Sequence, residues 1–373
     1  MGNKSSAITI NLDRSNLFYF TGETISGTVG LSVTEGKVEA DEVYIELTGE
    51  IGYTTTRTVH HHHGSGANPS FGHCHTHTPH HAIGHTNDYT TTEIDYHHVP
   101  FYTAKAVFSK LEPGQKAVVY TKGNYSWPFQ IPLSTHLPPT MYEPQSYPHV
   151  KYYLQVVIDK PWYKPNTRER RYLTICPHVN LLQNPQCLQS TIFGNQNRKD
   201  IILKGTLNKT GYVPGELVHI TIEIENPKRV LIKSIDFSMI QSSRIGEMSR
   251  DFNIFQTTLP NIMNTKDEHI KQSIPVKLPS MILPPSYQFQ GGLQRAAFVT
   301  NQYMLKLVAR VEGFFTNFDI SIPIILGTEP NPDQNHEHMS NLSAGFYGSN
   351  LEQPMFTNHD LPPTYESVVQ YKQ

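Results

Sequence analysis

The chain carries the same order of local signals twice, and this internal repeat is the feature that most constrains its fold. Each half opens with a Gly-Glu turn, continues to a Leu-Pro-Pro turn and ends on an alternating apolar segment. These signals lie at Gly22-Glu23, Leu137-Pro138-Pro139 and Val150 to Ile158 in the first half, and at Gly215-Glu216, Leu283-Pro284-Pro285 and Tyr303 to Val311 in the second. Alternation at period two is typical of half-buried strands, and proline interrupts strand pairing. The repeat predicts two domains of the same kind.

Length and periodicity give these domains a fold class. A chain of 373 residues exceeds what one hydrophobic core usually organises. No segment shows a long apolar stripe at the helical period, which favours an all-β protein of two tandem immunoglobulin-type β-sandwiches. We expect domains at residues 1–179 and 199–328, a Gln- and Asn-rich interdomain linker at 180–198, and a disordered tail at 329–373.

The two halves differ by one insertion. The spacing from Gly22 to Pro139 exceeds that from Gly215 to Pro285 by 47 residues, close to the 45 residues of the His-, Thr- and Gly-rich stretch at 54–98. We therefore expect 54–98 to form a mobile surface loop inserted between strands of the first domain.

Charge and targeting signals narrow the expected partners and the expected cellular compartment. A net charge of −2 offers no basic field for a nucleic acid backbone, so nucleic acid is not an expected partner. Three cysteines without CxxC spacing fit a reducing compartment, and no secretory signal or membrane-spanning apolar stretch is evident, which predicts a cytoplasmic protein. Gly2 and Ser6 match the signal for N-myristoylation, which would give reversible peripheral membrane contact.

The tail holds the clearest recognition motif, a Pro-Pro-x-Tyr ligand for WW domains. It comprises Pro362, Pro363, Thr364 and Tyr365, with Val368 following. Consecutive prolines hold a polyproline II helix before binding, so little conformational entropy is lost in an aromatic-lined groove. A second match at Pro284-Pro285-Ser286-Tyr287 coincides with the repeated Leu-Pro-Pro turn, and we interpret it as a turn that leads into a strand of the second sandwich.

Histidines concentrate in the insertion. Twelve of the twenty lie between His60 and His98, and the candidate metal ligands among them are His60, His61, His62, His63, His73, His75 and His77, with Cys74 as a further thiolate. Neutral imidazoles can bind zinc, copper or nickel, which makes a metal-responsive binding protein the alternative function. The competing interpretation is a solvated low-complexity insertion without a preset ligand geometry. No other cofactor is expected.

The sequence contains no recognised catalytic motif. The sequence lacks a Gly-x-Ser-x-Gly elbow, a phosphate-binding Gly-x-x-x-x-Gly-Lys and a His-Glu-x-x-His pair. Each cysteine is more simply a buried or loop thiol than a nucleophile. These observations predict that the protein is not an enzyme, and a hydrolase with an unrecognised triad is the weakest hypothesis.

The motifs together resemble the arrestin-domain-containing proteins, or α-arrestins. The similarity is carried by residues 211–216 (Gly-Tyr-Val-Pro-Gly-Glu), 222–226, 127–132 (Trp-Pro-Phe-Gln-Ile-Pro) and 323–328. It implies two arrestin-like sandwiches that act as an adaptor. Their folded body would hold a membrane receptor or transporter as cargo, and the tail would recruit a WW-domain HECT ubiquitin ligase for endocytosis and endosomal sorting. Recruitment to the plasma membrane and endosomes would follow. The chain departs from the family in having one clear tail motif where two are common, and in its histidine-rich insertion.

Overall fold

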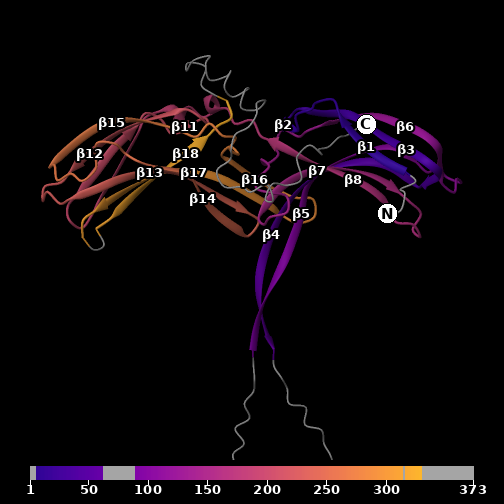
Figure 1. Cartoon of the computed structure of the whole chain (residues 1–373), viewed down its shortest axis with the longest axis horizontal. Helices are drawn as coiled ribbons and strands as arrows, with labels where there is room; N and C mark the ends of the chain where they lie inside the picture. The colour runs from indigo at the N-terminus through magenta and orange to yellow at the C-terminus, as the bar shows by residue number, and fades with distance from the viewer. Residues whose placement is uncertain (1–5, 62–88, 314–315, 330–373) are drawn as a thin grey trace, which may run out of the picture.

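A computed structural model describes residues 6–61, 89–313 and 316–329. These residues form two β-sandwich domains that lie side by side, and a long two-stranded ribbon projects from their junction (Figure 1). The all-β class and the two tandem sandwiches predicted from the sequence are confirmed. No helix among the described residues has the length and hydropathy needed to cross a bilayer.

The first domain packs two sheets face to face. The smaller sheet has the order β1-β3-β6, with β1 (Ser6–Leu12), β3 (Thr24–Ala40) and β6 (Val118–Pro132). The larger has the order β2-β8-β7-β4-β5, with β2 (Phe18–Phe20), β8 (Thr167–Cys176), β7 (His149–Asp159), β4 (Glu42–His61) and β5 (Tyr89–Lys110).

The second domain repeats this plan with two additional strands, β9 and β16. Its smaller sheet has the order β15-β12-β10-β9, with β15 (His269–Lys277), β12 (Leu217–Glu225), β10 (Ile202–Leu207) and β9 (Thr191–Gln196). Its larger sheet has the order β11-β18-β17-β13-β14, and β16 also pairs with β17. These strands are β11 (Gly211–Tyr212), β18 (Phe318–Leu326), β17 (Ala297–Val311), β13 (Ile232–Ile245), β14 (Met248–Thr258) and β16 (Tyr287–Gly291).

The Gly-Glu turns of the sequence repeat have the same structure in both domains. Gly22 and Gly215 adopt φ angles of +84° and +83°, a left-handed conformation that glycine reaches without steric cost. The carboxylates of Glu23 and Glu216 each accept a backbone N–H three residues upstream, from Phe20 at 2.8 Å and Val213 at 3.0 Å. A short parallel strand pair accompanies each turn, β2 with β8 and β11 with β18. The internal repeat is therefore a repeat of topology.

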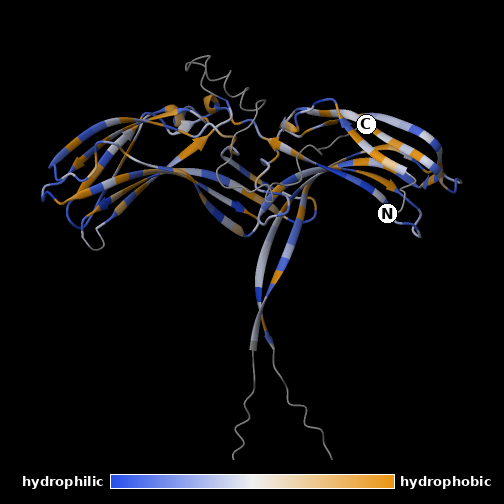
Figure 2. Ribbon diagram, viewed as in Figure 1, coloured by the Kyte–Doolittle hydropathy of each residue, from blue (hydrophilic) through white to orange (hydrophobic). Residues whose placement is uncertain are grey.

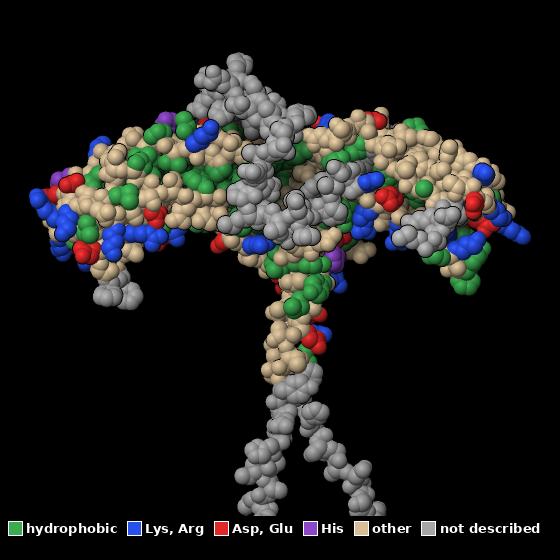
Figure 3. All heavy atoms as spheres, in the orientation of Figure 1, with side chains coloured by type: hydrophobic (Ala, Val, Ile, Leu, Met, Phe, Trp, Pro, Cys, Tyr) green, Lys and Arg blue, Asp and Glu red, His purple; other side chains and the backbone are tan. Residues whose placement is uncertain are grey.

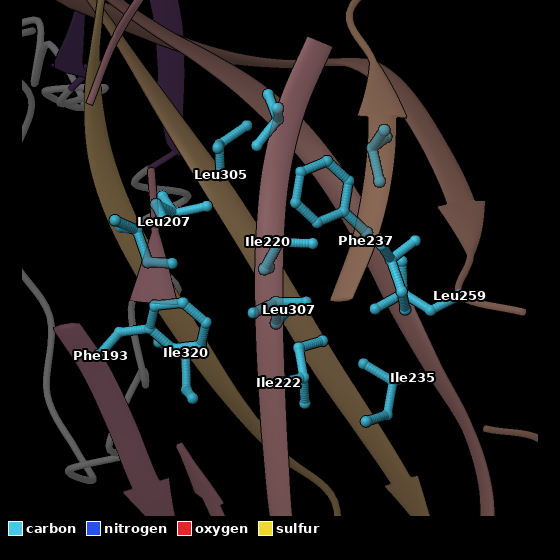
Figure 4. Packing of buried hydrophobic residues seen from close by; sticks show 14 of the residues in the cluster. Phe193, Leu207, Ile220, Ile222, Ile235, Phe237, Leu259, Leu305, Leu307 and Ile320 are labelled. Carbon is cyan, nitrogen blue, oxygen red and sulfur yellow. The ribbon is translucent and has the colours of Figure 1, made fainter. Parts of the chain in front are cut away.

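Alternating side chains build a core between the sheets of each domain. Apolar and polar residues alternate along most strands (Figure 2), and every second residue of β12 from Val218 to Ile224 is buried. Figure 4 shows Ile220, Ile222 and Leu307 among the side chains that fill the space between the two sheets of the second domain. Full burial of one such side chain contributes about 1.5–3 kcal/mol.

Two sequence expectations need correction. Residues 54–61 and 89–98, expected to belong to a surface loop, are paired strand residues of β4 and β5. Residues 191–196, expected to be linker, form β9 on the edge of the second domain, where they pair with β10. Two 3-10 helices, Leu181–Gln183 and Pro185–Leu188, precede β9, and their Leu181 and Cys187 are buried. Tertiary pairing thus orders segments whose polar composition suggested loops.

Candidate functional site

Most residues that the sequence singles out lie outside the described residues. These are Gly2, His62, His63, His73, Cys74, His75, His77, Pro362, Pro363, Thr364, Tyr365 and Val368. His60 and His61 are the last residues of β4, and His60 is exposed opposite Thr90 of β5. The lipidation site, the WW ligand and the histidine-rich metal site therefore stay predictions.

The β4–β5 ribbon carries the described ends of the histidine-rich insertion. β4 and β5 pair continuously from Gly52 opposite His98 to His61 opposite Tyr89. Arg57 lies 2.7 Å from Glu93 and 3.5 Å from Asp95 across the ribbon. A two-stranded ribbon has little apolar burial of its own, so such cross-strand pairs stabilise its register. The ribbon itself projects away from both domains (Figure 1).

The base of the ribbon contacts the second domain. The Thr54 backbone N–H donates to Met248 Sδ over 3.1 Å. The Tyr53 ring lies directly over Gly246, where an added Cβ would stand 2.4 Å from a ring carbon. Only glycine allows this approach, and the φ of +58° at Gly246 also favours glycine. The tight turn between β13 and β14 is thus fitted to the ribbon base.

One hydrophobic cluster spans the domain junction. Phe289, Ile245 and Val299 of the second domain are buried in the same cluster as the core of the first domain. The rings of Phe289 and Phe101 have centroids 5.2 Å apart. At the edge of the junction, the Tyr142 and Ser243 hydroxyls are hydrogen-bonded at 2.6 Å. A shared core of this kind resists relative motion of two domains.

The second proline motif belongs to this junction. Tyr287 begins β16, as the sequence interpretation of a turn leading into a strand predicted, and that interpretation is confirmed. Asn301 Nδ2 donates to the Pro284 and Pro285 carbonyls over 2.9 and 2.8 Å. The Tyr287 hydroxyl lies 3.1 Å from His136 Nδ1 of the first domain. These contacts show that the turn has a structural role.

The two cysteines among the described residues are buried thiols of low reactivity. Cys176 and Cys187 are both buried and free. Burial raises the pKa of the Cys176 thiol to about 12, so it stays protonated at neutral pH. This agrees with the interpretation of these cysteines as buried thiols.

Sequence reasoning missed one exposed aromatic tip, the turn between β7 and β8. Trp162 is 96% exposed and Tyr163 61% exposed, although both are large apolar side chains. Trp162 borders a shallow hollow that is also lined by Asp159, Lys160, Lys164, Asn166 and Arg168. Hydrophobic side chains and Lys or Arg side chains gather at the outer end of the first domain (Figure 3). The signal in the sequence was Lys160-Pro161-Trp162-Tyr163-Lys164, two aromatics between lysines.

The charge of this tip is positive. Lys164 and Lys37 both pair with Glu39, at 2.7 and 2.8 Å. Their hydrogen bonds lower the pKa of Glu39 to about 2. Lys37, Lys160, Lys164 and Arg168 outnumber the acidic Glu39 and Asp159 there. The tip, which we call the Trp162 tip, combines exposed aromatic rings with excess cationic charge.

Family comparison assigns the two domains. The model of the arrestin (or S-antigen) N-terminal domain matches residues 8–182, and that of the arrestin C-terminal domain matches residues 197–331. The two matches cover both sandwiches in the order in which they occur. Tandem arrestin domains support an adaptor role in trafficking. This chain belongs to the arrestin-domain-containing proteins.

Proposed function

We propose that the protein is a non-enzymatic trafficking adaptor of the α-arrestin type. It would link membrane-protein cargo to a WW-domain HECT ubiquitin ligase, so that ubiquitination directs the cargo into endocytosis and endosomal sorting. The observation that carries the proposal is the pairing of two arrestin domains with Pro362-Pro363-Thr364-Tyr365, which follows the second domain match at residue 331.

The junction supports the part of the proposal that concerns cargo. Because Phe289 and Val299 share a core with the first domain, the two sandwiches form one continuous body. A rigid body can present residues from both domains to one cargo protein without the entropic cost of ordering a hinge. The second Pro-Pro-x-Tyr match is held in the junction by Asn301, which leaves the tail motif as the ligand for a WW domain.

The Trp162 tip supports peripheral membrane contact. Trp and Tyr rings are favoured at the boundary between lipid headgroups and acyl chains, and Lys or Arg residues are attracted to anionic lipids. Trp162, Tyr163, Lys160 and Lys164 supply both kinds of group on one turn. A cytoplasmic adaptor with this tip would be recruited to the plasma membrane and endosomes, where its cargo lies.

The ligase contact is tested by affinity capture. WW-domain ligases are captured from cells with the full chain, with Tyr365→Ala and with Tyr371→Ala, a tyrosine of the same tail outside the motif. We expect Tyr365→Ala to lose capture and cargo ubiquitination, and Tyr371→Ala to retain both, because the WW groove reads the tyrosine of the motif. Equal capture by all three proteins would refute the proposed ligase contact.

A further inference from the structure

Three metal-ligating side chains from three neighbouring strands meet where the ribbon leaves the first domain. They are Glu50 of β4, His98 of β5 and His149 of β7, and their ligand atoms all lie within 4.8 Å of one another. The strand register brings them together, because Gly52 pairs with both His98 and His149. His98 belongs to the histidine-rich insertion in the sequence, whereas no local pattern marks Glu50 or His149 as a ligand. The cluster uses none of the residues of the proposed adaptor contacts.

His149 is held in the form that binds metal. It is fully buried, and its Nδ1 donates to the Ser146 carbonyl over 2.5 Å. That bond leaves the lone pair on Nε2, which has no hydrogen-bond partner among the described residues. An outer hydrogen bond from one ring nitrogen to a carbonyl is the usual support for a metal-bound histidine.

The orientation of the His98 ring is likewise fixed by contacts to both of its nitrogens. Its Nδ1 lies 2.7 Å from Glu50 Oε1, and its Nε2 lies 2.6 Å from the Tyr147 hydroxyl. Tyr147 therefore fixes the ring so that Nδ1 faces the carboxylate. Glu50 is itself buried, with 7% of its surface exposed, and a carboxylate in such a place needs a cationic partner.

Lys151 is that partner in the absence of metal. Its Nζ lies 3.0 Å from Glu50 Oε1 and 3.4 Å from the Pro144 carbonyl. A metal ion that binds Glu50 would meet the repulsion of this ammonium group, so Lys151 competes with metal for the carboxylate. The Pro144 carbonyl offers the ammonium group a second contact if Glu50 is taken by the ion. Lys151 is thus expected to limit metal affinity.

We propose that Glu50, His98 and His149 form a binding site for a divalent transition-metal ion of the zinc class. Two imidazole nitrogens and one carboxylate oxygen suit such an ion, and water would complete a four-coordinate shell. Gly52 is part of the site, because a Cβ there would stand 2.3 Å from the His149 ring. A bound ion ties β4, β5 and β7 together at the root of the ribbon.

Zinc titration of matched variants of the full chain tests the site. Wild type, His98→Gln, His149→Gln and His97→Gln are titrated by calorimetry, with circular dichroism to verify folding. His97 is the control, because it adjoins His98 but bonds to Thr55 at 2.7 Å and stacks on Tyr53 instead. Any zinc bound by the histidine-rich segment is common to all four proteins. We expect His98→Gln and His149→Gln each to lose one equivalent of zinc, and His97→Gln to lose none.

A fourth variant should change zinc binding in the opposite direction. Lys151→Met removes the competing ammonium group, and we expect it to tighten zinc binding at this site by at least tenfold, because the ion no longer meets a like charge beside Glu50. If His149→Gln fails to fold, the half-exposed His98 decides the outcome. The inference is overturned if His98→Gln binds as many equivalents as wild type, or if His97→Gln loses as many as His98→Gln.

Discussion

The Tyr303 hydroxyl donates a 2.7 Å hydrogen bond to the carbonyl oxygen of Pro284. The first domain repeats this bond, since the Tyr152 hydroxyl donates to the Pro138 carbonyl over 2.5 Å. Both tyrosines are almost completely buried in their strands, and both acceptors are the first proline of a Leu-Pro-Pro turn. The tyrosine gives a buried carbonyl its partner at the point where proline prevents ladder pairing. The repeated turn therefore has the same anchor in each domain.

The second of these turns depends more on Asn301 than on Tyr303. Asn301 is fully buried and also accepts from Gln241 Nε2 at 2.7 Å, in addition to its two bonds to the proline carbonyls. We expect Tyr303→Phe to lower the free energy of unfolding by about 1 kcal/mol, and Asn301→Ala by about 3 kcal/mol, because the latter leaves several buried groups unpaired. Urea denaturation measures both. Equal losses would contradict the greater role of Asn301.

Gly246 should be far less replaceable than a glycine of similar conformation elsewhere. Gly36 has a φ of +70° and nothing within 4 Å of an added Cβ, so Gly36→Ala isolates the backbone cost of about 1 kcal/mol. Gly246→Ala adds a clash with the Tyr53 ring, and we expect a loss of about 2–3 kcal/mol. Thermal unfolding of the two variants makes the comparison. A similar loss in both would mean that the Tyr53 ring moves aside at little energetic cost.

Phe289 should couple the unfolding of the two domains. Its ring is buried against Phe101 in the shared core, and Phe289→Ala is expected to cost about 3–5 kcal/mol. Loss of the junction core should also separate calorimetric unfolding into two transitions. Phe252→Ala is the control, because Phe252 is 46% exposed on β14. A single unchanged transition in Phe289→Ala would show that the junction core does not hold the domains together.

Asp236 should contribute stability that is lost in acid. Burial acts to raise its pKa, but hydrogen bonds from Arg310 at 2.6 Å and Thr258 at 3.0 Å prevail, and the pKa lies below its usual value. A lowered folded-state pKa gives stability that is present above the ordinary Asp pKa of about 3.9 and disappears as the pH falls through the folded pKa. We expect Asp236→Asn to destabilise by about 1–3 kcal/mol at pH 7, with a smaller difference from wild type at pH 3. A difference independent of pH would contradict the ionic role of Asp236.

The Trp162 tip should bind anionic membranes. Wild type is expected to bind vesicles containing phosphatidylserine, and Trp162→Ala to bind about tenfold more weakly, since burial of a large apolar side chain contributes about 1.5–3 kcal/mol. Ile192 is 82% exposed on β9 of the other domain, so Ile192→Ala serves as the control for an exposed apolar residue. Vesicle co-sedimentation at two salt concentrations separates the aromatic from the electrostatic contribution. Equal binding by all three proteins would exclude the tip as a membrane contact.

The sequence by itself determined the fold class and its repetition. Period-two alternation and the turn chemistry of Gly22, Gly215 and the Leu-Pro-Pro segments are local properties. They follow from the types of neighbouring residues and need no tertiary contact to be recognised. They sufficed to predict two sandwiches and to interpret Pro284-Pro285-Ser286-Tyr287 as a turn. The tail motif is likewise local, and its predicted role rests on sequence alone.

Only the tertiary structure decided where the polar segments pair and which distant residues meet. Residues 54–61 and 191–196 look like loops because their composition is polar, yet each is ordered by a partner strand. The cluster of Glu50, His98 and His149 depends on the register of three strands, and a shift of one residue would turn its side chains to opposite faces. Likewise, Phe289 joins the core of the first domain through domain packing that no local pattern encodes.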